Sequence, residues 1–262
     1  MAASDKLLVT LEDGIKRITL NRPERRNAVD TETIELLHEA IQRSAEDASR
    51  VIILTGAGDA FCAGADLQIS DGRDIRDVDV TASLRQHTNP TIIAMRQLAK
   101  PIIARIHGHA VGVGCNYALA CDLLIASEQA KFAQIFVRIG LMPDGGSTYF
   151  LPRLVGYHKA FELMALGDII NAREALSLGL VNRVVPYEEL DTTVNALAMR
   201  LAASPGIALA KIKAGLNQGE TSDLSAALEF EAVNQAACFG SQDFREGVTA
   251  FLEKRQANFK GQ

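Results

Sequence analysis

Two glycine-rich segments carry backbone groups that could do chemistry. They are Thr55–Leu67 (TGAGDAFCAGADL) and His107–Cys115 (HGHAVGVGC), and each follows a run predicted as a β-strand. Neither fits the dinucleotide pattern GxGxxG, because Phe61 and Tyr117 stand at the third glycine position, and no GKS or GKT of a P-loop occurs. Glycine loops let a ligand approach the backbone closely, and the first N–H groups of a helix are unpaired. Two such amides aimed at one carbonyl oxygen would stabilise an enolate that forms from it. The alternative is that the glycines only allow tight turns and close packing of helices against strands.

One carboxylate is a candidate acid or base. Asp144 lies in Met142–Gly146 (MPDGG), in a loop that is expected to open a helix. Apolar neighbours such as Phe136 and Ile139 would desolvate the carboxylate and raise its pKa, which makes it a better base. The alternative is ordinary turn and helix-capping chemistry, for which this residue order is also typical.

The elements that must position these groups follow an α/β pattern. Alternating apolar residues over 7–20 predict a β-hairpin, and Asp30 is expected to cap the next helix. Strands are predicted at 51–54, 102–106 and 123–125, separated by helices at 82–98 and 113–120. The run Val51–Leu54 has no polar interruption, which is typical of a strand covered on both faces.

The chain becomes mainly helical after about residue 156. Helices are predicted at 158–166, 172–178, 188–203, 206–217 and 222–239, with one strand at 181–185. A last helix is expected to start at Asp243 with Glu246 as capping-box partner. We therefore expect a core over residues 1–200 and a helical C-terminal region over 201–262.

Composition narrows the function classes. The 262 residues include 27 Lys and Arg against 32 Asp and Glu, a net charge of −5, which argues against a broad electrostatic grip on nucleic acid. No apolar run reaches the roughly 18 residues that span a bilayer. The N-terminal residues lack a signal-peptide layout, and the four cysteines form no CxxC pair. We expect a cytoplasmic protein without membrane contact, metal site or disulfides.

Four strings resemble one known family over essentially the whole chain. They are FCAGADL (61–67), HGHAVGVGCNYALACD (107–122), FVRIGLMPDGGSTYFLPRLVG (136–156) and FREGVTAFLEKRQANF (244–259). In this order they resemble the crotonase (enoyl-CoA hydratase/isomerase) family. The resemblance implies a spiral of β-α-β units with a helical trimerisation region, and a homotrimer or a dimer of trimers. It also implies an acyl-CoA substrate whose thioester oxygen lies between two backbone amides, which by motif position resemble those of Ala63 and Val113.

The resemblance also bears on the reaction. The two glutamates of the family hydratases match Asn116 and Phe136, neither of which is a carboxylate, so hydration by two glutamates is not expected. Asp144 instead matches an active-site aspartate of dienoyl-CoA isomerases, ring-epoxide isomerases and chlorobenzoyl-CoA dehalogenases. The surrounding string is most similar to the phenylacetate-pathway ring-epoxide isomerases.

Substrate contacts follow from the same resemblance. Phe251 and Lys254 resemble residues that close over CoA from the same or a neighbouring subunit, although Phe251 could equally pack in the core of its helix. From the residues themselves, the basic loop of Arg22, Arg25 and Arg26 is suited either to the CoA phosphates or to ordinary surface contacts. The other implied contacts are Ala65, Asp66, Leu67, Gly112, Asn116 and Phe136. Coenzyme A enters as part of the substrate, and no cofactor is expected.

We therefore expect an acyl-CoA isomerase in which Asp144 moves a proton from C2 to C4 of a 3-enoyl-CoA, or assists the opening of a ring-fused epoxide. Two alternatives stay open. One is a hydratase or dehalogenase-like enzyme in which Asp144 acts on water or as a nucleophile, and the other is an acyl-CoA binder without catalysis. His107 and His109 have no ligand partners at metal spacing, so a structural or substrate-packing role is expected.

Overall fold

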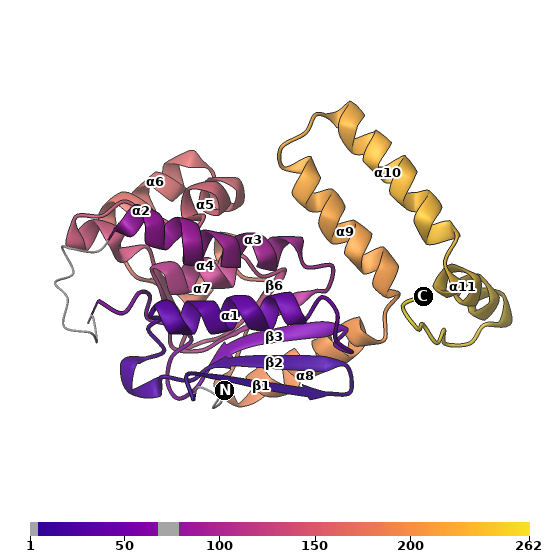
Figure 1. Cartoon of the computed structure of the whole chain (residues 1–262), viewed down its shortest axis with the longest axis horizontal. Helices are drawn as coiled ribbons and strands as arrows, with labels where there is room; N and C mark the ends of the chain where they lie inside the picture. Colours follow the sequence, from indigo (N-terminus) through magenta and orange to yellow (C-terminus); the bar gives the residue numbers. More distant parts are fainter. Residues whose placement is uncertain (1–4, 68–78) are drawn as a thin grey trace.

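The computed structural model describes residues 5–67 and 79–262, so the first four residues, which entered the signal-peptide expectation, lie outside it. Its main sheet has six strands in the order β1-β2-β3-β4-β6-β9 (Figure 1). These strands are Leu7–Glu12, Ile15–Leu20, Val51–Gly56, Ile102–Ile106, Leu123–Ser127 and Arg183–Val185. The β1–β2 hairpin is antiparallel and every later pair is parallel, which confirms the predicted α/β architecture.

Helices cover both faces of this sheet. Ile52 and Leu54 belong to the core cluster shared with α1 (Thr31–Arg43), whereas Val51 and Ile53 pack against Leu190, Val194 and Ala198 of α8 (Tyr187–Ala202). Successive strand residues point to opposite faces, so each face of β3 meets its own helix layer. This arrangement confirms the prediction made from the uninterrupted apolar run.

The predicted capping of the first long helix is also confirmed. Asp30 is the N-cap of α1, and its carboxylate accepts a hydrogen bond from the Thr33 N–H at 2.9 Å. The helices between the later strands are α4 (Val113–Leu119), α5 (Ser147–Val155), α6 (Tyr157–Leu166) and α7 (Ala172–Ser177). Short 3₁₀ turns cover Pro23–Arg25 and Ile135–Ile139.

A second, three-stranded sheet was not predicted. It has the order β5-β7-β8, formed by His109–Val111, Lys131–Ala133 and Ile170–Asn171. Its strands have two or three residues each, too few to show an alternating pattern. β5 leads directly into α4, so this small sheet fixes where α4 begins.

The helix predicted over 82–98 contains an irregular turn. Residues 80–97 form three consecutive helical pieces, namely α2 (Val80–Ser83), a π-helical turn (Leu84–Thr88) and α3 (Asn89–Gln97). Pro90 lacks an N–H group and its ring would clash with the carbonyl four residues earlier, so the turn before it widens. The N–H of Asn89 accordingly bonds to the carbonyl of Leu84.

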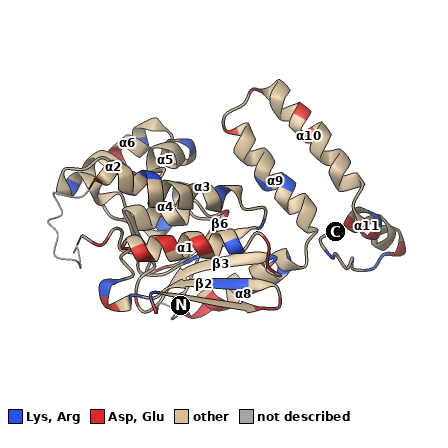
Figure 2. Cartoon of the chain, in the orientation of Figure 1, with Lys and Arg blue, Asp and Glu red and all other residues tan. Residues whose placement is uncertain are grey.

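Three helices extend from the core: α9 (Gly206–Gly219), α10 (Leu224–Phe239) and α11 (Gln242–Glu253) (Figure 1). Lys213 joins α9 to the core, because its buried ammonium group donates to the Met95 carbonyl and to Asp122 Oδ2, both at 2.8 Å. Figure 2 shows that α10 carries few charged residues, which are Glu229 and Glu231.

The predicted start of the last helix is wrong. Ser241 is the N-cap of α11, and its hydroxyl accepts a hydrogen bond from the Phe244 N–H at 3.0 Å. Asp243 is instead buried and accepts hydrogen bonds from the backbone of Lys260 and Gly261, while Glu246 pairs with Arg255. The C-terminal segment, which folds back on this helix, therefore takes up both predicted capping carboxylates.

None of the helices in the described ranges is both long and apolar enough to cross a membrane.

Candidate active site

The two glycine-rich segments lie side by side. Cys62 and Ala110 form a parallel bridge, in which the Cys62 N–H donates to His109 and the Val111 N–H donates to Cys62, both at 2.9 Å. Gly64 has a φ of +102°, and a Cβ at this residue would lie 3.0 Å from the Val111 carbonyl oxygen and 3.9 Å from the Cα of Gly112. Only glycine allows this conformation and this approach without strain. The backbones at Gly64 and Gly112 therefore meet.

The amide assigned to Ala63 is not available to a substrate. Its N–H group donates to the carbonyl of Arg26 at 3.0 Å. The prediction for Ala63 is therefore corrected: the amide is used in holding the loop of residues 22–28 against the glycine-rich segment.

Ala65 supplies the available amide instead. Val29 bonds to both neighbours of Ala65, because its N–H donates to Gly64 and its carbonyl accepts from Asp66, each at 2.8 Å. This bridge pattern turns the Ala65 N–H away from Val29. Within residues 5–67 and 79–262, neither the Ala65 nor the Val113 N–H donates to a hydrogen-bond acceptor. Each of these amides follows one of the two glycines that meet.

The Val113 amide has a further property. Val113 is the first residue of α4, so its unpaired N–H group points out of the helix N-terminus and carries part of the positive end of the helix dipole. Gly112, with a φ of +56°, turns the chain from β5 into this helix. The ring of Phe136 lies 3.8 Å from where a Cβ of Gly112 would stand.

Asp144 lies beside the start of α4. The next residue, Gly145, is buried, and a Cβ there would be 3.1 Å from Cγ2 of Val113 and 3.4 Å from Asn116. The backbone carbonyl of Asp144 accepts three hydrogen bonds: from Asn116 Nδ2 at 2.8 Å, from the Ser147 N–H at 3.1 Å and from the Ser147 hydroxyl at 3.0 Å. The loop is thus held by its main chain.

The carboxylate itself is not held. Oδ1 of Asp144 is buried and has no hydrogen-bond partner in the described part of the chain. Burial raises the pKa of Asp144 above the usual value of an aspartate, in the direction predicted from the sequence. A carboxylate with a raised pKa and a free oxygen is suited to accept a proton from a ligand.

Asn116 lies next to Asp144, and Phe136 lies next to Gly112. The side chains of Asn116 and Phe136 are both buried. Asn116 bonds to Gln134, whose Nε2 donates to Asn116 Oδ1 at 2.8 Å. Gln134 was not among the predicted site residues. A single polar residue inside the otherwise apolar string FAQIF (132–136) was the signal that could have marked it.

The other predicted substrate contacts fall in two places. Arg25 and Leu67 are exposed near the Ala65 bridge, and the Asp66 carboxylate pairs with Arg22 at 2.7 Å. Phe251 and Lys254 are exposed at the end of α11, which Figure 1 shows beyond α9 and α10, far from α4 and α5. A single chain does not bring these two residues to Asp144.

The nearby histidine and cysteines are structural. His107 Nδ1 lies 2.8 Å from the Arg105 guanidinium, which only donates, so the ring is neutral and its Nε2–H donates to the Gly58 carbonyl at 2.8 Å. Burial, and next the Arg105 charge, lower the pKa of His107. Burial raises the pKa of the Cys62 and Cys115 thiols to about 12, so neither is a thiolate nucleophile at neutral pH.

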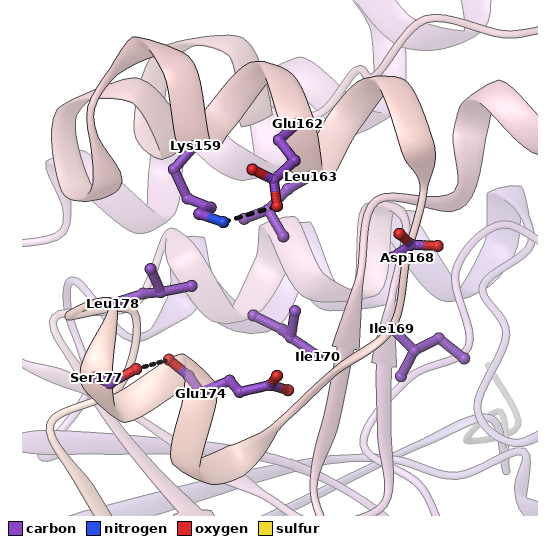
Figure 3. A pocket seen from close by; sticks show the side chains of 9 residues that line it. All are labelled: Lys159, Glu162, Leu163, Asp168, Ile169, Ile170, Glu174, Ser177 and Leu178. Atoms are coloured by element: carbon purple, nitrogen blue, oxygen red, sulfur yellow. Dashed lines mark hydrogen bonds and ion pairs between the residues drawn. The ribbon is translucent and has the colours of Figure 1, made fainter.

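A separate surface cavity of about 540 Å³ lies between α6, β8 and α7 (Figure 3). Figure 3 shows that Leu163, Ile170 and Leu178 are among the side chains that line it. Lys159 and Glu162, which also line it, form an ion pair at 2.7 Å. None of the predicted site residues lines it. The candidate active site is therefore the junction of the two glycine-rich segments with the Asp144 loop.

Comparisons with known proteins identify relatives over nearly the whole chain. The family model described as enoyl-CoA hydratase/isomerase matches residues 10–262. A 1,2-epoxyphenylacetyl-CoA isomerase from Escherichia coli is 38% identical over 97% of this chain and 98% of its own length. A crotonyl-CoA hydratase from Syntrophomonas wolfei is 39% identical over 98% of both chains.

A solved enoyl-CoA hydratase from Bacillus anthracis superimposes with a TM-score of 0.93, at 34% identity over 98% of this chain and 100% of that one. The fold and these comparisons thus define an enzyme of the crotonase fold that acts on CoA thioesters. The chain belongs to the enoyl-CoA hydratase/isomerase family.

Proposed function

We propose that the protein is an acyl-CoA isomerase that moves a double bond along the acyl chain. The thioester oxygen accepts hydrogen bonds from the Ala65 and Val113 amides. Asp144 removes a proton from C2 of a 3-enoyl-CoA, the C–H electron pair forms a double bond between C1 and C2, and the carbonyl π pair moves onto the thioester oxygen. Asp144 then returns the proton at C4, which gives the 2-enoyl-CoA with no net gain or loss of atoms.

The observation that carries this proposal is the free oxygen of Asp144. A buried carboxylate oxygen without a partner costs free energy unless a ligand uses it. It lies on a loop that contacts Val113 through Gly145, so one substrate can meet both the amide and the carboxylate. A single base next to an enolate-stabilising pair of amides suffices for a 1,3-proton shift.

Two further residues favour isomerisation over hydration. Asn116 and Phe136 occupy the positions that resemble the two hydratase glutamates, and neither side chain accepts a proton near neutral pH. The Asn116 amide is also already used, because it donates to the Asp144 carbonyl at 2.8 Å. A water molecule would therefore lack the pair of carboxylates that activates it.

A ring-fused epoxide thioester is a second substrate that we propose for the same groups. The likeness to the 1,2-epoxyphenylacetyl-CoA isomerase favours it. Asp144 would take a proton from the carbon next to the thioester carbonyl and return it to the ring, while the carbon–carbon bond shared by the epoxide and the six-membered ring breaks to give an oxepin-type thioester. The product is again an isomer of the substrate, and both substrates need Asp144 and the amides of Ala65 and Val113.

The test compares wild type, Asp144→Asn and Asp144→Ala in the conversion of a 3-enoyl-CoA into its conjugated product, followed by absorbance. We expect both variants to lose about 10²- to 10⁴-fold in kcat, the usual contribution of a positioned base. Asp168→Asn, at a carboxylate 68% exposed on the surface, is the matched control and should keep full activity. Full activity of Asp144→Asn would refute the proposal, and so would CoA-thioester binding by wild type without turnover of either substrate.

The pH dependence of kcat/KM in the wild type gives an independent test of Asp144 as the base. Asp144 must be ionised to accept a proton, and its pKa is raised. The acid limb of kcat/KM should therefore lie above the value of about 3.9 for an ordinary aspartate, with activity lost as the pH falls through it. An acid limb at or below that value would contradict Asp144 as the base.

We also propose that the chain assembles through its C-terminal helices into a homotrimer or a dimer of trimers. Exposed large apolar side chains follow α9 and α10, namely Ile212, Leu216, Leu224, Leu228, Val233 and Phe239. Apolar surface of this extent is typical of an interface between subunits. Such an assembly would let Phe251 and Lys254 reach the site of a neighbouring chain.

A further inference from the structure

Gln134 is a buried polar residue that the proposed proton transfer does not use. It lies between β7 and the 3₁₀ turn Ile135–Ile139, and its exposed fraction is 3%. Its Nε2 donates to Asn116 Oδ1 at 2.8 Å, and Asn116 Nδ2 donates to the Asp144 carbonyl at 2.8 Å. Two hydrogen bonds thus connect Gln134 to the loop that carries the base.

The direction of this pair of bonds is fixed by chemistry. A backbone carbonyl only accepts, so Asn116 must turn its NH₂ group toward Asp144. That orientation leaves the Asn116 amide oxygen facing Gln134, where it needs a donor. The NH₂ group of Gln134 supplies the donor, and a side chain that only accepts would not.

Asn116 lies on the same helix as the Val113 amide, one turn further along. The bond from Asn116 to the Asp144 carbonyl therefore sets the separation between the thioester-binding amide and the carboxylate. We infer that Gln134 is a positioning residue, which acts through Asn116 to hold the Asp144 loop against the start of α4. This inference rests on the proposed function of Asp144.

The first test replaces Gln134 by glutamate, which has the same shape but presents oxygens to the Asn116 oxygen. At about pH 8 we expect kcat to fall about 10²-fold, since a shift of about 1 Å in a reacting group has that effect. KM for the CoA thioester should change little, because Gln134 is buried behind Asn116. Gln134→Met, which removes the donor without adding a charge, is the matched variant and should lose less.

The pH dependence separates positioning from a general structural defect. A buried glutamate keeps its proton to a higher pH than an exposed one, and when protonated it donates to Asn116 as glutamine does. The kcat of Gln134→Glu divided by that of wild type should therefore rise from about pH 8 to about pH 6. The kcat of Gln134→Met divided by that of wild type should not change with pH over this range.

Division by the wild-type rate removes the titration of Asp144. The other titratable groups beside Gln134 are Cys115 and Asp168, which line a small cavity with it. Burial raises the pKa of Cys115 to about 12, so this thiol does not titrate in this range, and Asp168 is the same in wild type and in both variants. Neither group should give the expected rise.

Crystal structures of wild type and Gln134→Glu provide a readout that does not depend on turnover. We expect the distance between Asn116 Nδ2 and the Asp144 carbonyl to lengthen from 2.8 Å in the variant. An unchanged distance, or a wild-type kcat with a flat pH ratio, would overturn the inference. A displaced loop in this variant together with a fully active Asp144→Asn would refute the proposed function and leave the positioning of the loop established.

If Gln134→Glu does not fold, the same kinetic and structural measurements are made on Gln134→Met. A lower kcat with an unchanged KM and a lengthened distance supports positioning, and wild-type kinetics overturn it.

Discussion

At the residue scale, the main chain of Asp144 is held while one oxygen of its carboxylate is left free. Three hydrogen bonds end on its carbonyl oxygen, and none in the described chain ends on Oδ1. The fixed loop aims the carboxylate, and burial raises its pKa. These two properties, a fixed main chain and a free carboxylate oxygen, suit Asp144 to the role of base that we propose for it.

The role that we propose for the Val113 amide, hydrogen bonding to the thioester oxygen, can be tested by removing its N–H group. Val113 is the first residue of α4, where proline is tolerated because its missing N–H is not needed by the helix. We expect Val113→Pro to lower kcat about 10²- to 10³-fold, the usual effect of losing one such donor.

Val113→Ala is the control for this change, since it shortens the same side chain and keeps the N–H group. The proline variant should lose far more kcat than this variant, whose own loss measures the contact between the Val113 side chain and the Gly145 loop. If the proline variant has the circular dichroism of wild type and also its kcat, the Val113 amide does not stabilise the reacting oxygen.

Asp144 was singled out as a candidate from the residues around it, because a carboxylate before two glycines is a local signal. The amides of Ala63 and Val113 were expected only from the family resemblance by motif position. The resemblance did not distinguish Ala63 from Ala65. Which amide of a loop is free depends on pairing with Arg26 and Val29, which are distant in sequence. Gln134 was missed for the same reason, because its partners lie on other elements.

At the scale of elements, the long buried strands and most helices were predictable from their apolar periodicity. The small sheet of β5, β7 and β8 was not, because strands of two or three residues carry no period. The start of α11 was misplaced since Asp243 and Glu246 bind the C-terminal segment and Arg255. Tertiary contacts overrode a capping pattern that is valid locally.

Lys213 gives a test of how α9 is joined to the core. Its ammonium group is buried against the Met95 carbonyl and Asp122. We expect Lys213→Met to lower the free energy of unfolding by about 2–3 kcal/mol, because hydrogen bonds to a charged group are lost and Asp122 loses its cation.

Lys211→Met is the matched control on the same helix and should change the free energy of unfolding by less than about 0.5 kcal/mol. Both are measured by urea unfolding at one protein concentration, because assembly makes stability depend on concentration. Equal values for the two variants would show that Lys213 does not hold α9.

At the scale of the whole molecule, a single chain leaves its C-terminal helices without cover. α10 has no buried residue, although most of its side chains are apolar. Phe251, 80% exposed, lies on α11 away from the Asp144 loop. Both features are accounted for if another copy of the chain packs on this region.

Light scattering after gel filtration tests the assembly. Wild type should have three or six times the chain mass of 28.2 kDa. Leu216→Glu combined with Leu228→Glu should dissociate it, because the charges enter an apolar interface. Leu8→Glu, at a residue 46% exposed on β1, is the control and should keep the wild-type mass. A wild-type protein that elutes as a single chain would contradict the proposal.

The approach of Gly64 to Gly112 has a consequence for mutational scanning. The groups assigned to the thioester oxygen belong to the main chain at Ala65 and Val113, so replacing either side chain by another leaves the donor in place. Of the three groups that we propose act on the substrate, an alanine scan would pass over the two amides and report only Asp144. Proline substitutions, or ester bonds in place of these two amides, are the changes that would reveal it.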